Sequence, residues 1–398
     1  MGSLFEDIDD TIFDDKDVLA EEYQPDEILE RDDEIGQYKH TLKDVLFGRN
    51  PTNVMLYGKA GVGKTAVTTY VLNELQAEAE TRDETSDVHV HRFNCNGETV
   101  FSTVRALVNQ LLPAHAADFP KRGLSTSDAL EEFYSQLERV GGTHLVVFDE
   151  LDHLEDANTL LYDIPRARAK GDLEDARIGI IGISNNYKFR DRLSSKVRDA
   201  LNEDEIAFST YTANELQNIL RDRAEKALVD DGFDESAIRL AAALAAKDNG
   251  SARQALDLLR KGGEIAERND DSTVTEHHID AARDAVRRGR LKDKISDQST
   301  HAQLVLEAMA RIENRGDTPA RSKEVMSVYQ EVAVDREQEP LSTLKSVQNH
   351  LSDLTMLGFL TQNQVNEGRG GGVYHEYELD MTPDVVFGTC DELFATTF

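Results

Sequence analysis

The segment from Gly58 to Thr65 reads Gly-Lys-Ala-Gly-Val-Gly-Lys-Thr and fits the pattern G-x-x-x-x-G-K-[ST]. Glycines at these spacings allow the backbone to curl, so that successive N–H groups face inward and can hold phosphate oxygens. Lys64 can then reach the β- and γ-phosphates of a nucleotide, and Thr65 can place its hydroxyl on Mg²⁺. The nucleotide-binding residues that this pattern predicts are Gly61, Val62, Gly63, Lys64, Thr65 and Ala66.

The flanking sequence favours this interpretation over a chance glycine turn. The apolar run Val54–Tyr57 predicts a buried strand that enters the loop, and residues 66–80 have the apolar spacing of a helix. A helix that begins at the loop directs the positive end of its dipole at the phosphates. We therefore expect an α/β fold in which the loop joins a central strand to a helix.

A second apolar run, residues 144–148, ends in Asp149 and Glu150, and Asp149 follows Lys64 by 85 residues. A strand buried on both faces of a parallel sheet is apolar along its length, and its carboxyl end faces the nucleotide crevice. We predict that Asp149 holds Mg²⁺ and that Glu150 orients or deprotonates the attacking water. Capping of the following helix is the alternative role of these carboxylates.

Two more polar side chains are candidates for the same site. Asn185 follows the apolar run 178–183, and an amide at that strand end can reach the γ-phosphate or the water; a simple Asn turn is the alternative. Ser251 has the character of a helix N-cap, which places Arg253 in the first helical turn. A cation is unfavourable there, so Arg253 is expected to have another partner, such as a phosphate.

The composition bounds the class of protein. The chain has 398 residues and a formal net charge of −32, with 28 Arg against 16 Lys. This diffuse acidity suits a cytosol of very high salt, where self-repulsion is screened; an ordinary acidic protein with an acidic docking face is the alternative. Cys95 and Cys390 lie in no metal-ligand spacing, and no run of 18 apolar residues occurs. A cytoplasmic protein without a membrane segment is expected.

Changes of pattern along the chain predict four regions. Residues 1–18 are acidic and poor in core residues, so a flexible acidic tail is expected. Residues 19–210 are expected to form the nucleotide-binding core, and residues 211–290, rich in Ala, Leu, Arg and Glu, a small helical lid. Residues 291–398 are expected to form a separate module of helices followed by two strands.

The last module contains a candidate surface for DNA. Residues 341–351 read as an amphipathic helix, and strand-like runs at 359–364 and 373–379 flank a Gly-rich turn that carries Arg369. Such a turn suits a wing that enters the minor groove, although an exposed loop is the plain alternative. The module has 9 Lys plus Arg against 18 Asp plus Glu, so shape and hydrogen bonds would have to carry much of the binding. The outward residues of the helix that can contact base edges and phosphates are Ser342, Thr343, Lys345, Ser346, Gln348 and Asn349.

Taken in order, the phosphate loop, the Asp-Glu strand, the asparagine and the arginine resemble the AAA+ ATPases. A finer resemblance, over roughly residues 16–385, is to the archaeal origin-recognition and cell-division-control type replication initiators. The runs that carry it are Tyr23-x-Pro25-Asp26-Glu27, Arg31-Asp32-x-Glu34, Gly58 to Thr65, Asp149-Glu150-Leu151-Asp152, Asp163 to Ala169 and Gly182-Ile183-Ser184-Asn185. The resemblance implies an AAA+ core with a parallel sheet, a small helical lid and a C-terminal winged-helix domain.

The resemblance also implies roles for single residues in the nucleotide site. Asn185 would be the first sensor, and Arg253 the second, reaching across from the lid. Tyr211 and Arg223 match family positions that contact the nucleotide, with hinge packing as the alternative for Tyr211.

Two other stretches match family segments that act outside the chain's own nucleotide site. The stretch that supplies an inter-subunit arginine reads Ser194-Ser195-Lys196-Val197-Arg198 here; Lys196 matches the basic position of the family, and Arg198 lies two residues beyond it. Arg198 is the candidate of the two, because an Arg can fork onto a γ-phosphate and a Lys cannot. Arg166 and Arg168 lie in the initiator-specific segment that contacts DNA in the family.

The function that follows from the resemblance is an ATP-dependent replication initiator. It would bind double-stranded origin DNA, associate with itself on DNA, help to load the replicative helicase and act with the nucleoid in the cytoplasm. Its cofactors would be ATP or ADP and Mg²⁺, with slow ATP turnover serving as a switch. A paralogous AAA+ regulator of transcription or plasmid copy number is the alternative. A clamp-loader-type motor is a third interpretation, against which the winged helix argues.

Overall fold

The computed structural model describes residues 12–82, 87–366 and 373–395. Contacts within the chain divide it into two compact units, Met1–Asp280 and Ala281–Phe398. The predicted boundaries at 210/211 and 290/291 stay a prediction. Within the described residues, no helix combines the length and the apolar character needed to cross a membrane.

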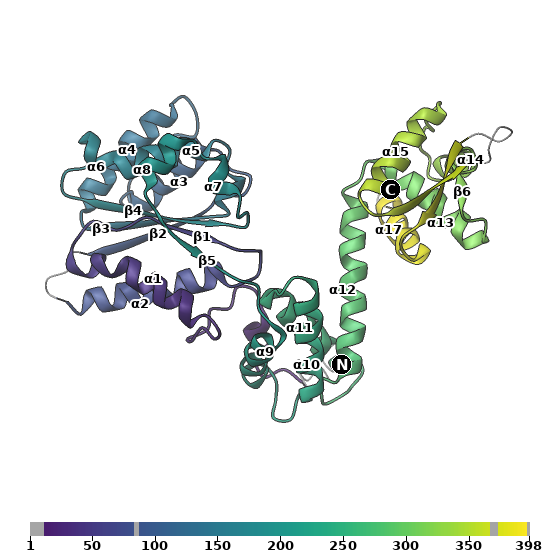
Figure 1. The fold of residues 1–398 in the computed structure, drawn as a ribbon, viewed down its shortest axis with the longest axis horizontal. Helices are drawn as coiled ribbons and strands as arrows, with labels where there is room; N and C mark the ends of the chain where they lie inside the picture. The colour runs from purple at the N-terminus through teal and green to yellow at the C-terminus, as the bar shows by residue number, and fades with distance from the viewer. Residues whose placement is uncertain (1–11, 83–86, 367–372, 396–398) are drawn as a thin grey trace, which may run out of the picture. The chain divides into compact units, whose positions relative to one another are not determined.

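The first unit is built on a five-stranded parallel sheet with the order β2-β3-β4-β1-β5 (Figure 1). Its strands are β1 (Val54–Tyr57), β2 (Val88–Asn94), β3 (Thr143–Asp149), β4 (Arg177–Ser184) and β5 (Asp204–Ala207). All four residues of β1 are buried, as expected of a central strand covered on both faces. The register pairs Tyr57 with Ser184 and Asn94 with Asp149, so the carboxyl ends of the strands meet at one edge. The predicted α/β fold is confirmed.

Helices cover both faces of this sheet (Figure 1). One face carries α1 (Asp32–Leu42) and α2 (Lys64–Glu80). The other carries α3 (Val100–Leu111), α4 (Thr126–Val140), α5 (Ala157–Asp163), α6 (Ala167–Lys170), α7 (Phe189–Arg192) and α8 (Ser195–Leu201). Short 3₁₀ turns lie between them, namely η2 (Lys43–Phe47), η3 (Leu151–His153) and η4 (Ile164–Arg166). Capping boxes at Thr99 and Ser125 fix where α3 and α4 begin, and Phe133 and Phe148 are fully buried in the core beneath them.

The lid belongs to the same unit and consists of helices. They are α9 (Ala213–Ala227), α10 (Glu235–Asp248), α11 (Ala252–Arg268) and α12 (Glu276–Ser296), the last of which runs into the second unit. A capping box between Thr212 and Glu215 starts α9 directly after the hinge that follows β5. Ser251 caps α11 by accepting a hydrogen bond from the N–H of Gln254.

The N-terminal segment differs from the expected flexible tail. Ile12 and Phe13 are 0% and 4% exposed, and η1 (Lys16–Leu19) follows them. The N–H of Val229 donates to Ile12 O at 3.0 Å. The Phe13 ring packs directly on Gly263, because a Cβ on that glycine would lie 2.4 Å from the ring. The assignment of residues 12–18 to a tail was therefore wrong, because two apolar side chains among many acids anchor this segment to the lid.

The second unit is a winged-helix domain, as predicted. Its helices are α13 (Thr300–Arg315), α14 (Ser322–Asp335), α15 (Leu344–Met356) and α17 (Pro383–Ala395), and its antiparallel sheet has the order β6-β8-β7. The strands are β6 (Ala320–Arg321), β7 (Leu360–Asn366) and β8 (Val373–Leu379). Helix α15 begins later than the predicted residue 341, because Thr343 caps it. Buried Glu307 pairs with Arg311 and Arg336 in this core, a network that the sequence analysis did not predict.

Candidate nucleotide site and DNA-contact surface

The phosphate loop joins β1 to α2 and takes the backbone shape that its glycines allow. Gly61 and Gly63 have φ values of +77° and +90°, in the region where a side chain would be strained. Gly63 is the residue that precedes the first turn of α2. Backbone N–H groups at a helix N-terminus are free of intrahelical partners, so they are available to an anion.

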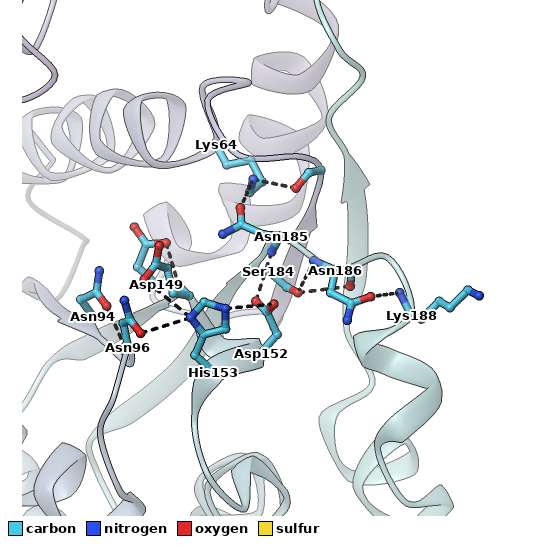
Figure 2. Close-up of polar contacts among 12 residues, drawn as sticks. Lys64, Asn94, Asn96, Asp149, Asp152, His153, Ser184, Asn185, Asn186 and Lys188 are labelled. Atoms are coloured by element: carbon cyan, nitrogen blue, oxygen red, sulfur yellow. Dashed lines mark hydrogen bonds and ion pairs between the residues drawn. The ribbon is translucent and has the colours of Figure 1, made fainter. Parts of the chain in front are cut away.

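The amine of Lys64 lies between this loop and the end of β4 (Figure 2). Its Nζ donates to Gly58 O at 2.8 Å, to Lys59 O at 2.7 Å and to the side-chain oxygen of Asn185 at 2.9 Å. Burial lowers the pKa of Lys64 to about 8, against the opposing effect of the nearby carboxylates. Asn185 reaches this position because β4 is the direct neighbour of β1 in the sheet.

Asp149 and Thr65 form the second contact across the site. The Thr65 hydroxyl donates to Asp149 Oδ2 at 2.8 Å, and Asp149 Oδ1 accepts the N–H of Glu150 at 2.8 Å. A hydroxyl and a carboxylate beside a phosphate loop are oxygen donors of the kind that Mg²⁺ takes, together with phosphates and water. The described residues contain no cluster of three His, Cys, Asp or Glu that could hold a metal alone. Thr65 and Asp149 therefore fit a metal ion that takes its other ligands from a bound nucleotide and from water.

Glu150 has an uncommon backbone conformation, with φ of 52° and ψ of 39°. A non-glycine residue in the left-handed region is costly and is seen where surrounding structure imposes it. The bend carries the chain from β3 into η3, and Glu150 Oε2 lies 4.0 Å from His153 Nδ1. The role of Glu150 in orienting water stays a prediction.

Asp152 and His153 are site neighbours to which the sequence analysis gave no role. Asp152 Oδ1 accepts the N–H of Asn185 at 3.1 Å, which fixes the segment after β4 to the segment after β3. His153 Nδ1 lies 3.3 Å from Asn96 Oδ1, and Figure 2 shows its ring between Asn96 and Asp152. The second aspartate of the Asp-Glu-Leu-Asp run was the signal that could have identified Asp152.

The lid reaches the loop through the first turn of α11. The N–H of Ala252 donates to Gly61 O at 2.9 Å, and a Cβ at Gly61 would meet Ser251 Oγ at 2.0 Å. Arg253 follows directly, and its Nη2 pairs with Glu21 Oε1 at 2.6 Å; both side chains are about half exposed. The structure thus brings Arg253 to the loop, with a carboxylate of the N-terminal segment as its partner.

Tyr211 and Arg223 are both well buried. The Tyr211 ring lies over the guanidinium of Arg31, with 3.7 Å from its centroid to Cζ, and a Cβ at Gly63 would lie 2.9 Å from its hydroxyl. Arg223 Nη1 donates to Val18 O at 3.2 Å and its guanidinium lies over the Tyr23 ring. Tyr211 thus lies beside the phosphate loop, and its contact with a nucleotide stays a prediction, whereas Arg223 is committed to the N-terminal segment.

Arg198 lies on α8 and is partly exposed. Within the described residues, its guanidinium has no hydrogen-bond or ion-pair partner, and Lys196 is exposed on the same helix. An arginine held on a short helix without an internal partner is available to a group outside the chain. Its predicted inter-subunit role stays a prediction.

The two arginines of the initiator-specific segment differ in their surroundings. Arg166 is exposed and its guanidinium lies 5.0 Å from the centre of the Tyr162 ring. Arg168 Nη1 donates to Ala176 O at 2.7 Å, which ties it to the residue before β4. Arg166 is therefore the freer of the two for contact with DNA.

The polar residues predicted to read DNA surround the start of α15. Ser342 and Thr343 precede the helix, and the Thr343 hydroxyl caps it by accepting the N–H of Ser346 at 3.2 Å. The hydroxyls of Thr343 and Ser346 also bond to each other at 2.8 Å, which occupies part of their capacity for DNA. Lys345 and Asn349 are exposed and Gln348 is partly exposed, whereas Arg369 lies outside the described residues.

Comparison with known proteins places the chain in a family. An AAA domain model matches residues 48–193, a Cdc6 AAA+ ATPase-type lid domain 217–284, and a CDC6 C-terminal winged-helix domain 293–389. ORC1-type DNA replication protein 8 of Halobacterium salinarum is 47% identical over 376 residues, 94% of each chain. The chain belongs to the ORC1-type DNA replication proteins.

Other members of the family agree with this placement. ORC1-type DNA replication protein 15 of Haloarcula marismortui is 42% identical over 93% of this chain and 90% of its own. Among solved structures, the Aeropyrum pernix ORC1 protein in complex with DNA matches this chain with a TM-score of 0.77 and 33% sequence identity. The match covers 97% of this chain and 98% of the Aeropyrum pernix chain. The halobacterial relatives come from halophilic archaea, as the acidic composition led us to expect.

Proposed function

We propose that this ORC1-type protein is a nucleotide-controlled initiator that binds double-stranded origin DNA and helps to load the replicative helicase. The observation that carries the nucleotide part is the convergence of Lys64, Asn185, Asp149 and Thr65 at the carboxyl edge of one sheet, with Arg253 arriving from the lid. The DNA part is supported by membership of a replication-protein family and by a relative of 33% identity whose structure contains DNA.

Each side chain has a defined task when ATP is present. The loop amides and Lys64 hold the phosphates, while Asn185 is close enough to exchange its bond to Lys64 for one to the γ-phosphate or a water. Mg²⁺, held by Thr65 and Asp149, would neutralise charge that develops on the phosphates. Glu150 orients the water, and Arg253 exchanges Glu21 for phosphate, which draws the lid toward the core.

Slow turnover suits a switch better than a motor. Arg198 is the arginine that a neighbouring subunit would present to the γ-phosphate, so a single chain lacks one source of charge stabilisation. Self-association on DNA would then raise the rate of hydrolysis, and the bound nucleotide would report whether the initiator has assembled.

DNA binding by so acidic a chain has to rely on defined contacts. Residues of α15 and the wing provide hydrogen bonds and shape, while the counterion-release contribution is already small in molar salt. Arg166 offers a further cation at the AAA+ core. A paralogous regulator remains the second candidate, because Lys345 is the only Lys or Arg among the six residues in and just before α15 that are predicted to contact DNA.

Genome-wide immunoprecipitation of the tagged chain in its host tests the proposal and separates the two candidates. An initiator is expected to occupy a few origin-like repeat clusters, and the Lys64→Ala variant should change that occupancy. Occupancy of many promoters with no enrichment at origins would instead identify a regulator.

A further inference from the structure

Arg31 joins the phosphate loop to the hinge between core and lid. It occupies the N-cap position of α1, where its side chain makes no capping hydrogen bond, and it is only 3% exposed. Its Nη1 pairs with Glu34 Oε1 at 2.8 Å, which provides the countercharge that a buried guanidinium requires. The remaining donors of the fork are therefore free to bind neutral carbonyls.

Two of these donors converge on one carbonyl of the phosphate loop. Nε and Nη2 lie 3.2 Å and 2.9 Å from Val62 O. A planar trans peptide holds its C=O and its N–H on opposite sides, so a Val62 carbonyl that faces Arg31 turns the N–H of Gly63 away from it. In the same way, the bond from Ala252 N–H to Gly61 O sets the direction of the Val62 N–H. Arg31 and the lid each orient one amide of the loop.

The same guanidinium binds the hinge that follows β5. Nη2 also donates to Ser209 O at 2.8 Å, and the Tyr211 ring stacks on the guanidinium at 3.7 Å. The N–H of Tyr211 donates in turn to Gly250 O at 3.0 Å, next to the Ser251 cap of α11. The planar guanidinium of Arg31 thus links the Val62 carbonyl of the loop to the hinge and, through Tyr211, to α11 of the lid.

We propose that Arg31 is a positioning residue that couples phosphate binding in the loop to movement of the lid. Phosphate draws the Gly63 amide, the Val62 carbonyl turns with it, and Arg31 carries the change to Ser209 and Tyr211. This inference rests on the proposed nucleotide function. Lysine cannot replace Arg31 in this role, because a single ammonium has neither the planar fork nor the stacking face.

The test uses the full chain and the variants Arg31→Lys and Arg31→Ala. Arg336→Lys is the matched control, because it alters another Arg–Glu pair, one with a buried carboxylate, in the second unit. ADP affinity is measured by calorimetry in molar KCl, unfolding temperature by calorimetric scanning, and protection of residues 209–211 and α11 by hydrogen exchange with and without ADP.

Arg31→Lys is expected to weaken ADP binding by between about tenfold and a hundredfold, the effect of losing hydrogen bonds from a charged group. It should also abolish the ADP-dependent protection of residues 209–211. Arg336→Lys should lower the unfolding temperature without changing either quantity.

Unchanged affinity and unchanged protection in Arg31→Lys would overturn the proposal. If the wild type fails to bind ADP, the proposed nucleotide function fails instead, so the two failures are distinguishable. If neither Arg31 variant folds, Tyr211→Leu removes the ring that stacks on the guanidinium while Arg31 keeps its carbonyl partners Val62 and Ser209. An ADP response of α11 identical to the wild type in that variant would then contradict the coupling.

Discussion

Lys64 donates a hydrogen bond to the side-chain oxygen of Asn185 at 2.9 Å, and this bond joins the start of α2 to the end of β4. A nucleotide would replace it, because the phosphates attract the amine more strongly than a neutral amide does. The amide of Asn185 is then released toward the γ-phosphate. The pair is therefore a reporter of whether the loop is occupied.

Asn185→Ala is expected to separate binding from hydrolysis. Lys64 keeps its charge in this variant, so the dissociation constant for ATP should stay within about threefold of the wild type, while the loss of a group that acts on the γ-phosphate should lower kcat by about tenfold or more. Calorimetry and phosphate release measure the two quantities. A loss of affinity as large as that of Lys64→Ala would contradict this division of roles.

The N-terminal segment should stabilise the lid. Phe13→Ala removes a ring that is 4% exposed and packed against Gly263, and a buried Phe→Ala change costs about 3–5 kcal/mol. Chemical denaturation, with hydrogen exchange at α9 and α11, should locate this loss in the lid. Phe47→Ala is the control, because Phe47 is 58% exposed and its removal should change stability little. Equal losses of unfolding free energy in Phe13→Ala and Phe47→Ala would show that the N-terminal segment does not stabilise the lid.

Glu21 should compete with phosphate for Arg253. The pair is about half exposed, so Glu21→Gln should change stability by less than about 1 kcal/mol while raising ATP affinity by up to about fivefold at constant KCl. Glu22→Gln removes the same charge, and within the described residues Glu22 has no ion pair, so it serves as the control. Equal affinities of the two variants would mean that Glu21 does not hold Arg253 in solution.

Two buried histidines predict how stability depends on pH. His91 Nε2 lies 3.0 Å from His144 Nδ1 between β2 and β3, and burial lowers the pKa of His91 to about 4 and of His144 to about 3. The unfolded chain binds protons below about pH 6.5, whereas the folded chain does not, so the free energy of unfolding should fall as the pH falls from about 6.5 toward 4.

Substitution of one of these histidines tests that dependence. In His144→Gln, the free energy of unfolding should fall less steeply as the pH falls from about 6.5 toward 4. Denaturant unfolding at a series of pH values measures this slope. His277→Gln removes an imidazole from an exposed position and should leave the slope as it is. An unchanged slope in His144→Gln would exclude the buried pair as the cause.

The sequence was most informative where function lies at strand ends. Lys64, Asp149 and Asn185 were placed together because parallel strands bring their carboxyl ends to one edge, and the apolar runs before them identified those strands. The structure brings these three residues into one site.

Contacts between distant segments had no such signal. Arg31 binds carbonyls of Val62 and Ser209, and no local pattern reports which carbonyl a guanidinium reaches. Ile12 and Phe13 were overlooked because two apolar residues in an acidic stretch show no period. The start of α15 was misplaced because the cap lies at Thr343, inside an apolar spacing that begins at Leu341.

The most direct test is to titrate ATP into the full chain and into Lys64→Ala, and to measure the binding heat by isothermal calorimetry in molar KCl with Mg²⁺. We expect the wild type to bind one ATP per chain and Lys64→Ala to bind at least about a hundredfold more weakly, because the charge at the β- and γ-phosphates is lost. Equal affinity in the two proteins, or no binding by a folded wild type, would contradict the account.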